Sequence, residues 1–440
     1  MSICVEVSLL SGRRHSESEK GSDSLTLQIR RVQLRRAAKA FAAILGDGSV
    51  ATWGDTMRGG DCSAVLHRLQ NVQQIHAADH SFAAILGDGS VVTWGLPEAG
   101  GDCSAVQDQL KNVQHIQANA AAFAAILGDG SVVTWGDAAR GGDSSAVQHR
   151  LKNVQQIQAS VSAFAAILGN GSVVTWGVAS IGGDSTAVQD QLQNVQHIQA
   201  CRYAFAATLA DGSVLTWGDA NQGGDSSAVQ DKLKNVQQIQ AAPSAFAAIL
   251  GDGSVVTWGH QFLGGDSSAV QNELKNVRQI QATAGAFAAV LGDGSVVTWG
   301  LSSHGGDSSA VQAQLQNVQH VQACSSAAFA AIVGDGSVVT WGDSRYGGDS
   351  GAVQHRLKNV LHIQASATAF AAILGDGSVV TWGDARHGGD KTAVQARLRM
   401  VQHIAASDGA FAALLEDGSV VTWGNAVLAK VVIAGPSMTS

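Results

Sequence analysis

A near-identical unit recurs ten times along the chain, and this period constrains the fold more than any other feature. Copies of AFAAILGNGSVVTWG, as found at 163–177, end on tryptophans that are 41 residues apart, with one gap of 42 between Trp299 and Trp341. The ten tryptophans are Trp53, Trp94, Trp135, Trp176, Trp217, Trp258, Trp299, Trp341, Trp382 and Trp423. A fixed period of about 20–50 residues is typical of solenoids, propellers and arrays.

Each unit predicts three short antiparallel strands. In one copy these are Gln155–Ala159, Phe164–Leu168 and Ser172–Gly177, which are rich in Val, Ile, Phe and Trp and alternate with period two. A GDG or GNG triplet between the second and third strands supplies residues that adopt positive φ in a tight hairpin. The aspartate of this triplet is therefore interpreted as a turn former and not as an acid catalyst.

The remainder of the unit predicts about two turns of helix. In Asp143–Val154, Val147, Leu151 and Val154 fall on one helical stripe. Ser145 and Gln148 match a capping box, and Asn153 stands where the helix should end. This helix would lead from the third strand of one unit to the first strand of the next.

A three-stranded unit cannot bury both faces alone, so neighbouring units must stack on one another. We therefore expect an all-β fold with short linking helices, a β-propeller-like array of ten three-stranded blades. An open superhelical solenoid of the same units is the alternative. The predicted organisation is a leader at 1–30, the array at 31–424 and a C-terminal cap or tail at 425–440. Within the tail, residues 431–434 are a candidate closing strand.

Charge and composition exclude several classes of function. The formal net charge is −8, but residues 1–40 carry eight Lys/Arg against four Asp/Glu, so the rest of the chain is strongly acidic. An acidic array argues against binding to a phosphate backbone, so no nucleic-acid partner is expected. No metal, cofactor or enzyme motif is present, and the histidines that alternate with Gln, Asp or Ala between units indicate a solvated face.

The cysteines and the apolar segments indicate where the chain resides. The five cysteines are an odd number without CxxC spacing, which favours reduced thiols and an intracellular, cytoplasmic or nuclear protein. Cys62 and Cys103 occupy the place of Ser144 and are interpreted as small-residue substitutions. No apolar run approaches the ~18 residues of a membrane helix, so we expect no membrane partner. We also expect the protein to be a monomer.

Two tracts differ between otherwise constant units. One follows the WG pair, and the other precedes the Phe strand. Strand direction predicts that both emerge at one end of each blade, opposite the GDG turns. Loops on a rigid scaffold often carry binding residues, and Arg, Tyr and Phe are typical interface anchors. The predicted partner-binding residues are Arg58, Arg140, Arg202, Tyr203, His260, Phe262, His304, Arg345, Tyr346 and Arg386.

The sequence DGSVVTWG, preceded by AFAAIL and followed by a Gly pair, resembles the repeat of the regulator of chromosome condensation family, in its compact bacterial-like form. The resemblance covers all ten units and implies a β-propeller, usually of seven blades. The strand-opening His of the family is Ala here, as at Ala163 and Ala204, and its Gly-Gln-Leu-Gly loop is Gly-Gly-Asp, as at 141–143. Residues Cys4–Leu10 and Ser24–Arg30 weakly resemble remnants of a ubiquitin-like domain.

These observations leave three functional hypotheses. The favoured one is a non-catalytic protein–protein interaction scaffold that uses the variable loop face. The family resemblance implies a second, a guanine-nucleotide exchange factor for a small GTPase, although no unit carries an inserted wedge. The third is a ubiquitin-ligase-associated propeller protein or fragment, which the leader suggests. Partner identity does not follow from the sequence.

Overall fold

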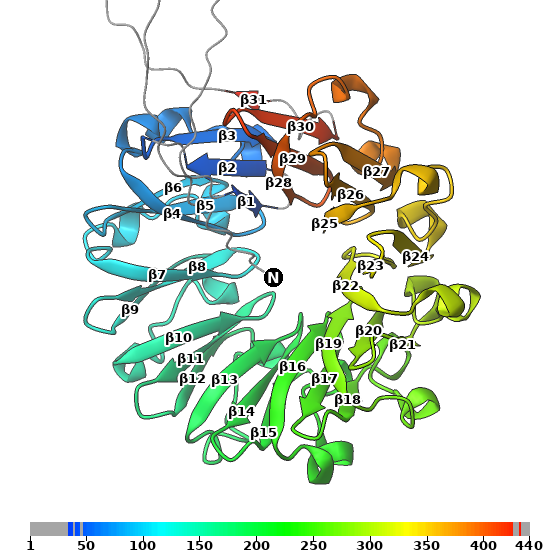
Figure 1. Cartoon of the computed structure of the whole chain (residues 1–440). Coiled ribbons are helices and arrows are strands. Elements are labelled where there is room, and N and C mark those ends of the chain that lie inside the picture. Colours follow the sequence, from blue (N-terminus) through cyan, green and yellow to red (C-terminus); the bar gives the residue numbers. More distant parts are fainter. Residues whose placement is uncertain (1–33, 38–39, 45–46, 426–430, 433–440) are drawn as a thin grey trace, which may run out of the picture.

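Ten antiparallel sheets follow one another around a ring, one from each sequence unit (Figure 1). The computed structural model describes residues 34–37, 40–44, 47–425 and 431–432, so the predicted leader and its two strands lie outside the described residues. We number the blades 1 to 10 in chain order. The inner strands are β1 (Leu34–Ala37), β4 (Val72–Ala77), β7 (Val113–Ala118), β10 (Val154–Ala159), β13 (Val195–Ala200), β16 (Val236–Ala242), β19 (Val277–Ala282), β22 (Val318–Ala323), β25 (Val360–Ala365) and β28 (Val401–Ala406).

Each inner strand pairs with a middle strand, which pairs in turn with an outer strand. The middle strands are β2 (Ala40–Ile44), β5 (Ser81–Leu86), β8 (Ala122–Leu127), β11 (Ala163–Leu168), β14 (Ala204–Leu209), β17 (Ala245–Leu250), β20 (Ala286–Leu291), β23 (Ala328–Val333), β26 (Ala369–Leu374) and β29 (Ala410–Leu415). The outer strands are β3 (Val50–Gly54), β6 (Val91–Gly95), β9 (Val132–Gly136), β12 (Val173–Gly177), β15 (Val214–Gly218), β18 (Val255–Gly259), β21 (Val296–Gly300), β24 (Val338–Gly342), β27 (Val379–Gly383) and β30 (Val420–Gly424). The three predicted strands of the unit are thus confirmed to within one residue.

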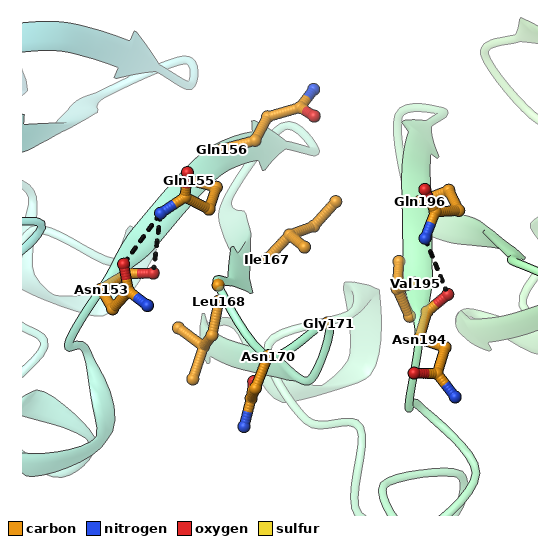
Figure 2. Close-up of a pocket in the computed structure, with 11 residues that line it drawn as sticks. Asn153, Gln155, Gln156, Ile167, Leu168, Asn170, Gly171, Asn194, Val195 and Gln196 are labelled. Carbon is orange, nitrogen blue, oxygen red and sulfur yellow. Dashed lines mark hydrogen bonds between the residues drawn. The ribbon is translucent and has the colours of Figure 1, made fainter.

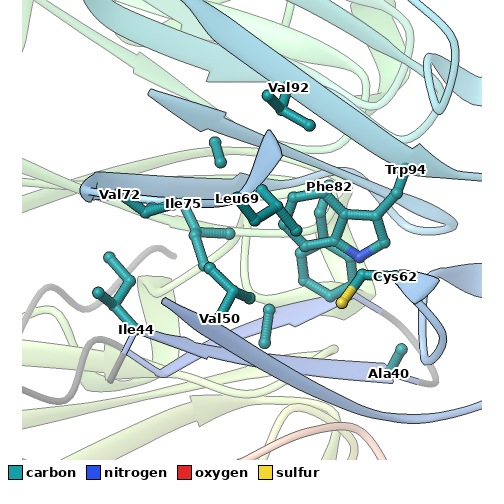
Figure 3. Packing of buried hydrophobic residues seen from close by; sticks show 12 residues of the cluster. Ala40, Ile44, Val50, Cys62, Leu69, Val72, Ile75, Phe82, Val92 and Trp94 are labelled. Carbon is teal, nitrogen blue, oxygen red and sulfur yellow. The ribbon is translucent and has the colours of Figure 1, made fainter. Parts of the chain in front are cut away.

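The two faces of a blade differ in side-chain size, and this difference lets the blades nest. In blade 4, Phe164 stacks on Trp176 with ring centroids 5.2 Å apart, and this face packs against Ala122, Ala124 and Ile126 of blade 3. The opposite face of blade 4 is mostly alanine and valine and receives the Phe–Trp pair of blade 5. Figure 3 shows the same packing between blades 1 and 2, with Phe82 and Trp94 in the cluster. The AFAAI pattern therefore places an aromatic pair on one face and a receiving surface on the other.

The glycine pair after each outer strand packs on the aromatic pair of the next blade. Gly141 has φ 93°, and a Cβ there would lie 2.7 Å from the Phe164 ring. Its carbonyl oxygen accepts a hydrogen bond from the Trp176 Nε1–H at 3.0 Å. Both the positive φ and the close approach require glycine, which explains why this residue recurs in every linker.

The linkers contain the predicted short helices, which are of the 3-10 type, and in Asp143–Val154 only Gln148–Arg150 is helical, which is shorter than the two turns predicted. Those directly after the outer strands are η1 (Thr56–Arg58), η3 (Pro97–Ala99), η5 (Ala138–Arg140), η7 (Ala179–Ile181), η8 (Ala220–Gln222), η10 (Gln261–Leu263), η12 (Ser302–His304), η14 (Ser344–Tyr346) and η16 (Ala385–His387). The later ones are η2 (Ser63–Arg68), η4 (Ser104–Val106), η6 (Gln148–Arg150), η9 (Ser227–Lys232), η11 (Ser268–Val270), η13 (Ser309–Gln314), η15 (Gln354–Arg356) and η17 (Thr392–Val394).

Side-chain hydrogen bonds explain why no longer helix forms. The backbone N–H of Ser145 donates to Asp143 at 2.8 Å in a turn that precedes η6, and η6 itself has no side-chain cap. Gln148 donates to the Val132 carbonyl at 2.8 Å and accepts from Ser144. The predicted capping box is therefore absent, because Gln148 instead satisfies a backbone group on the free edge of the outer strand. Asn153 ends the linker with φ 54°.

The ring is closed, which decides against an open solenoid. Strand β31 (Val431–Val432) pairs antiparallel with β3, so the first sheet has four strands and contains both ends of the array. Phe41, Ala43 and Trp53 of blade 1 pack against Ala410 and Ala412 of blade 10. The prediction of a closing strand is confirmed for Val431–Val432.

Four cysteines are free and buried, as expected for small-residue substitutions. Cys103 approaches Gln107 at 3.4 Å, as Ser144 approaches Gln148 in the next linker. Burial raises the pKa of the Cys201 thiol to about 11. The fifth, Cys4, lies outside the described residues.

We therefore expect Cys201 to resist alkylation in the native protein. With a pKa of about 11, roughly one thiol in a thousand would be ionised at pH 8, and the side chain is shielded from the reagent. Iodoacetamide labelling followed by mass spectrometry measures this, with the urea-unfolded protein as the fully reactive control. Rapid labelling of Cys201 in the native protein would contradict the buried position.

Within the described part of the chain, no helix has the length and apolar character needed to cross a membrane.

Candidate functional site

The two variable tracts of a blade meet at one end of the sheet, as strand direction predicts. In blades 2 to 10, a backbone hydrogen bond joins the two tracts. The N–H of Asp137 donates to the Ala121 carbonyl at 2.9 Å, and that of Asp219 donates to Tyr203 at 3.0 Å. We call this end of the ring the loop face and the opposite end, with the GDG turns, the hairpin face.

Backbone hydrogen bonds also connect the loops of successive blades. Val161 of blade 4 donates to the Arg202 carbonyl of blade 5, and Arg202 donates to the Pro243 carbonyl of blade 6, each at 3.1 Å. The same relation links Ala284, Ser326, Ala367 and Asp408. Pro243 has no N–H, so the run is interrupted between blades 6 and 7. The loop face is thus a rim whose loop backbones are joined by hydrogen bonds from blade 2 to blade 10, except between blades 6 and 7.

The predicted residues occupy two kinds of position on this face. Arg202 and Tyr203 lie in the loop between the inner and middle strands of blade 5, and His260 directly precedes η10. The others lie on the short helices after the outer strands, and these are Arg58, Arg140, Phe262, His304, Arg345, Tyr346 and Arg386. Arg140, Arg202, Phe262, Arg345 and Arg386 are exposed, while the rest are half-buried.

Eight of the ten residues lie on consecutive blades. The linkers after blades 6 and 7 are in direct reach of each other, because a Cβ on Gly285 would lie 3.0 Å from Leu263 and 3.4 Å from His304. We call the surface formed over blades 5 to 9 the arc. Its members are Arg202, Tyr203, His260, Phe262, His304, Arg345, Tyr346 and Arg386. Arg58 and Arg140 follow blades 1 and 3 and lie apart from the arc (Figure 1).

Aspartates that sequence reasoning did not select orient the arginines. Asp343 accepts the backbone N–H of Arg345 at 2.9 Å and pairs with the guanidinium at 2.6 Å, and this hydrogen bonding holds the pKa of the carboxyl below its usual value. Asp384 and Arg386 repeat the arrangement at 3.4 Å. Such exposed pairs contribute little to stability, so their main effect is to position the guanidinium. The signal in the sequence was the recurring Asp two residues before Arg.

Aromatic rings add a second type of contact surface. The Arg345 guanidinium lies 5.3 Å from the centre of the Tyr346 ring, and Arg202 lies 5.7 Å from that of Tyr203. The Phe262 side chain is 68% exposed, although phenylalanine is normally buried. Met57 is also exposed on this face, beside Arg58, and was missed by the sequence analysis because only polar and aromatic anchors were considered.

The hairpin face carries a different feature, a hollow between neighbouring inner strands (Figure 2). The hollow between blades 4 and 5 has a volume of about 560 Å³, and a similar one of about 510 Å³ lies between blades 7 and 8. The first is lined by Asn153, Gln155, Gln156, Ile167, Leu168, Gly169, Asn170, Gly171, Asn194, Val195 and Gln196. Gln155 donates to Asn153 at 2.9 Å, so much of the amide capacity is already satisfied within the wall.

Neither face assembles residues for metal binding. Among the described residues, no group of three or more His, Cys, Asp or Glu side chains is close enough to hold a metal ion. The GDG aspartates are committed to turns, since Asp129 accepts from both the backbone N–H and the hydroxyl of Ser131. The arrangement on the loop face therefore offers cations, hydrogen-bond donors and aromatic rings to an external surface.

Comparison with known proteins gives matches among solved structures alone. No family model matches the chain, and no curated protein matches it. Similar structures include yeast RCC1 (Prp20) bound to Kap60, with 15% identity, a TM-score of 0.36 and coverage of 76% of this chain and 86% of that chain. Prp20p from Saccharomyces cerevisiae, described with its binding to Gsp1p and histones, has 16% identity and a TM-score of 0.34, with coverage of 52% of this chain and 72% of that chain. The CRINKLY WD40 ectodomain of the Arabidopsis thaliana receptor kinase ACR4 has 17% identity and a TM-score of 0.33, with coverage of 62% of this chain and 98% of that chain. Proteins of the family that the repeat resembles are thus among the structures to which this chain is similar.

Proposed function

We propose that the protein is a non-catalytic interaction scaffold that binds a protein partner through the arc. The observation that carries this proposal is the clustering of exposed Arg side chains, exposed Phe262 and two half-buried Tyr rings on consecutive blades of an otherwise uniform ring. Phe262 and the pairs Arg202–Tyr203 and Arg345–Tyr346 are of the types that dominate interface energies.

The scaffold supports this use because the loops are held by backbone hydrogen bonds. A partner would meet side chains whose supporting loops are already ordered, so binding would cost less conformational entropy than on flexible loops. The guanidinium groups are also oriented by Asp343 and Asp384. Since the two arginine side chains are exposed, an acidic group of the partner can reach each guanidinium from the solvent side.

The test compares two variants with matched numbers of changes. The first replaces Arg202, Phe262, Arg345 and Arg386 with serine, and it leaves Tyr346 intact because that ring packs partly in the core. The control replaces Met57, Arg58, Glu98 and Arg140 with serine, and these residues are on the same face but outside the arc. After crosslinking capture from cell extract, the partner is purified and its affinity is measured for both variants.

We expect the arc variant to bind at least tenfold more weakly, because losing two or more anchors of this type costs over ~1.4 kcal/mol. The control should bind as the unmodified protein does, with unchanged far-UV circular dichroism for both. Equal binding by the arc variant and the unmodified protein would exclude the arc.

The exchange-factor hypothesis follows from the family resemblance alone, and no contact in the structure favours it. A nucleotide-release assay against a panel of small GTPases distinguishes it from a scaffold. Acceleration that is lost in the arc variant would assign exchange activity to this surface. The ubiquitin-pathway hypothesis rests on residues 1–30, which lie outside the described residues.

A further inference from the structure

Two large apolar side chains are exposed where other blades carry polar ones. Leu361 is 68% exposed and Met400 is 56% exposed, and with Met57 and Phe262 they are the exposed large hydrophobic residues of the described chain. Leu361 is the second residue of β25, a position that is Gln or Arg in the other repeated inner strands. Met400 directly precedes β28, where the other units have Asn. Both departures are therefore specific to blades 9 and 10.

The two side chains stand at positions that, between blades 4 and 5, border one hollow on the hairpin face. Their counterparts in blades 4 and 5 are Gln155 and Asn194, which both line the hollow in Figure 2. The backbone geometry is repeated at blades 9 and 10, because a Cβ on Gly377 would lie 2.9 Å from the Met400 Cα, and one on Gly171 would lie 2.8 Å from the Asn194 Cα. The equivalent position between β25 and β28 thus carries apolar side chains, Leu361 and Met400, in place of amides.

The leucine at position 361, which replaces a glutamine, also changes the packing of the nearby turn at Gly375. In blade 4, Gln155 holds the Asn153 amide, whose Nδ2 would lie 2.1 Å from a Cβ on Gly169. Leu361 cannot hold Asn359 in this way, and the nearest Asn359 atoms would be 3.6 Å from a Cβ on Gly375. The turn next to Leu361 is therefore less filled by the neighbouring side chain than its equivalents are.

We propose that residues Leu25–Ile29 of this chain dock against Leu361 and Met400. The position of β1 supports this occupant. Strand β1 pairs antiparallel with β2, with Ala37 opposite Ala40 and Leu34 opposite Ala43, so the chain enters β1 from the hairpin face. Blade 1 packs on blade 10, and β28 of blade 10 contacts β25 of blade 9. The entry point is therefore separated from Leu361 by the inner strand of blade 10.

The reach and the residue pattern of the preceding chain support this occupant. Leu25, Leu27 and Ile29 stand five to nine residues before Leu34, which corresponds to a reach of about 17–32 Å for extended chain. In an extended segment these three side chains fall on one face, and Thr26 and Gln28 fall on the other. An apolar face of this kind matches the apolar side chains between β25 and β28, which the hollows lined by amides do not offer.

Methionine oxidation in the full chain tests the proposal, since sulfoxide formation follows exposure of the thioether. Met57, on the loop face, is the internal reference. With dilute hydrogen peroxide and peptide mass spectrometry, we expect Met400 to oxidise roughly fivefold more slowly than Met57, because docking covers it. The triple variant L25S/L27S/I29S should bring the Met400 rate to that of Met57 and leave the Met57 rate unchanged.

The variant L361Q provides a matched control, because it restores the residue of the neighbouring blades and so preserves the fold. It should also raise the Met400 rate, whereas Thr26→Ser should not. Equal Met400 rates in the unmodified chain and the triple variant would overturn the proposal. Protection of Met400 that persists in the triple variant but falls on dilution would assign this apolar position to a second copy of the chain, which also overturns it.

Discussion

Replacing Trp258 with alanine is expected to destabilise the protein by about 3–5 kcal/mol. Trp258 is 4% exposed, stacks on Phe246 with ring centroids 5.2 Å apart, and belongs to the cluster between blades 5 and 6. The substitution removes the ring from a seam in the middle of the array and leaves the Gly223 carbonyl without its indole donor. Urea unfolding followed by far-UV circular dichroism measures the loss, since the remaining nine tryptophans complicate fluorescence.

A pair of conservative substitutions separates the packing contribution from that of the hydrogen bond. Trp258→Phe removes an indole N–H that is bonded to Gly223 at 3.1 Å, whereas Trp53→Phe removes a buried indole N–H that has no acceptor among the described residues. Both lose similar apolar volume, so Trp258→Phe should cost about 1–2 kcal/mol more than Trp53→Phe. Equal costs would show that the hydrogen bond to the glycine linker adds no stability.

Trp53 differs from the other nine because of where it stands in the ring. Every other tryptophan follows a linker whose glycine carbonyl accepts a hydrogen bond from the indole N–H, as Gly388 does from Trp423 at 3.0 Å. Blade 1 is not preceded by such a linker, and its outer strand pairs with β31. Leu66 replaces the glutamine that covers the outer-strand edge in the next linkers, and the outer edge of β3 is instead paired with β31 at Thr52 and Trp53.

The sequence predicts the strands and the aromatic column because these features repeat with a fixed period. Phe164 and Trp176 had to share a face of the blade, and the alternation of Ala165 and Ile167 placed the complementary surface on the other. Strand direction likewise placed both variable tracts on one face. Local pattern and global packing agree in these parts of the unit, so a single copy contains the information.

The linker helix is shorter than predicted because its side chains bond to distant backbone groups. Val147 and Leu151 do fit a helical stripe, but Gln148 is drawn to the Val132 carbonyl, 16 residues earlier in the chain. Ring closure depends on β31 meeting β3, a contact between the two ends of the array that no periodic pattern encodes. The grouping of the arc residues on one surface likewise depends on which blades are neighbours. The same holds for the placement of Leu361 near Met400. Tertiary contacts of this type override local propensity.

Replacing Lys391 with serine is expected to stabilise the protein by about 1–3 kcal/mol at pH 7. Lys391 is 5% exposed and occupies the place of Ser350 in the preceding linker, where the hydroxyl accepts from Thr340 at 3.0 Å and donates to Gln354 at 2.7 Å. The ammonium instead contacts Gln395, and no salt bridge accompanies it among the described pairs. Burial, followed by repulsion from Arg356, lowers its pKa from 10.5 to about 8.

The pH dependence identifies the charge as the cause. Below pH 8 the lysine is protonated in both the folded and the unfolded state, so the folded state bears the full cost of the buried ammonium. Between pH 8 and 10.5 the unfolded state binds more protons than the folded state, so the unmodified protein gains stability as the pH rises. The advantage of Lys391→Ser should therefore be constant below pH 8 and should shrink from pH 8 to 10.5.

An exposed lysine in the neighbouring linker, Lys358, provides the matched control. Lys358→Ser should change the free energy of unfolding at pH 7 by less than ~0.5 kcal/mol, because this side chain is exposed. Chemical denaturation of both variants and the unmodified protein at pH 7, 9 and 10 gives the comparison. An advantage of Lys391→Ser that is the same at pH 7 and 10 would mean that the hydroxyl network, and not the removed charge, accounts for the gain. A loss of stability at pH 7 would mean that the lysine stem packs better than the serine that the other linkers use at this place.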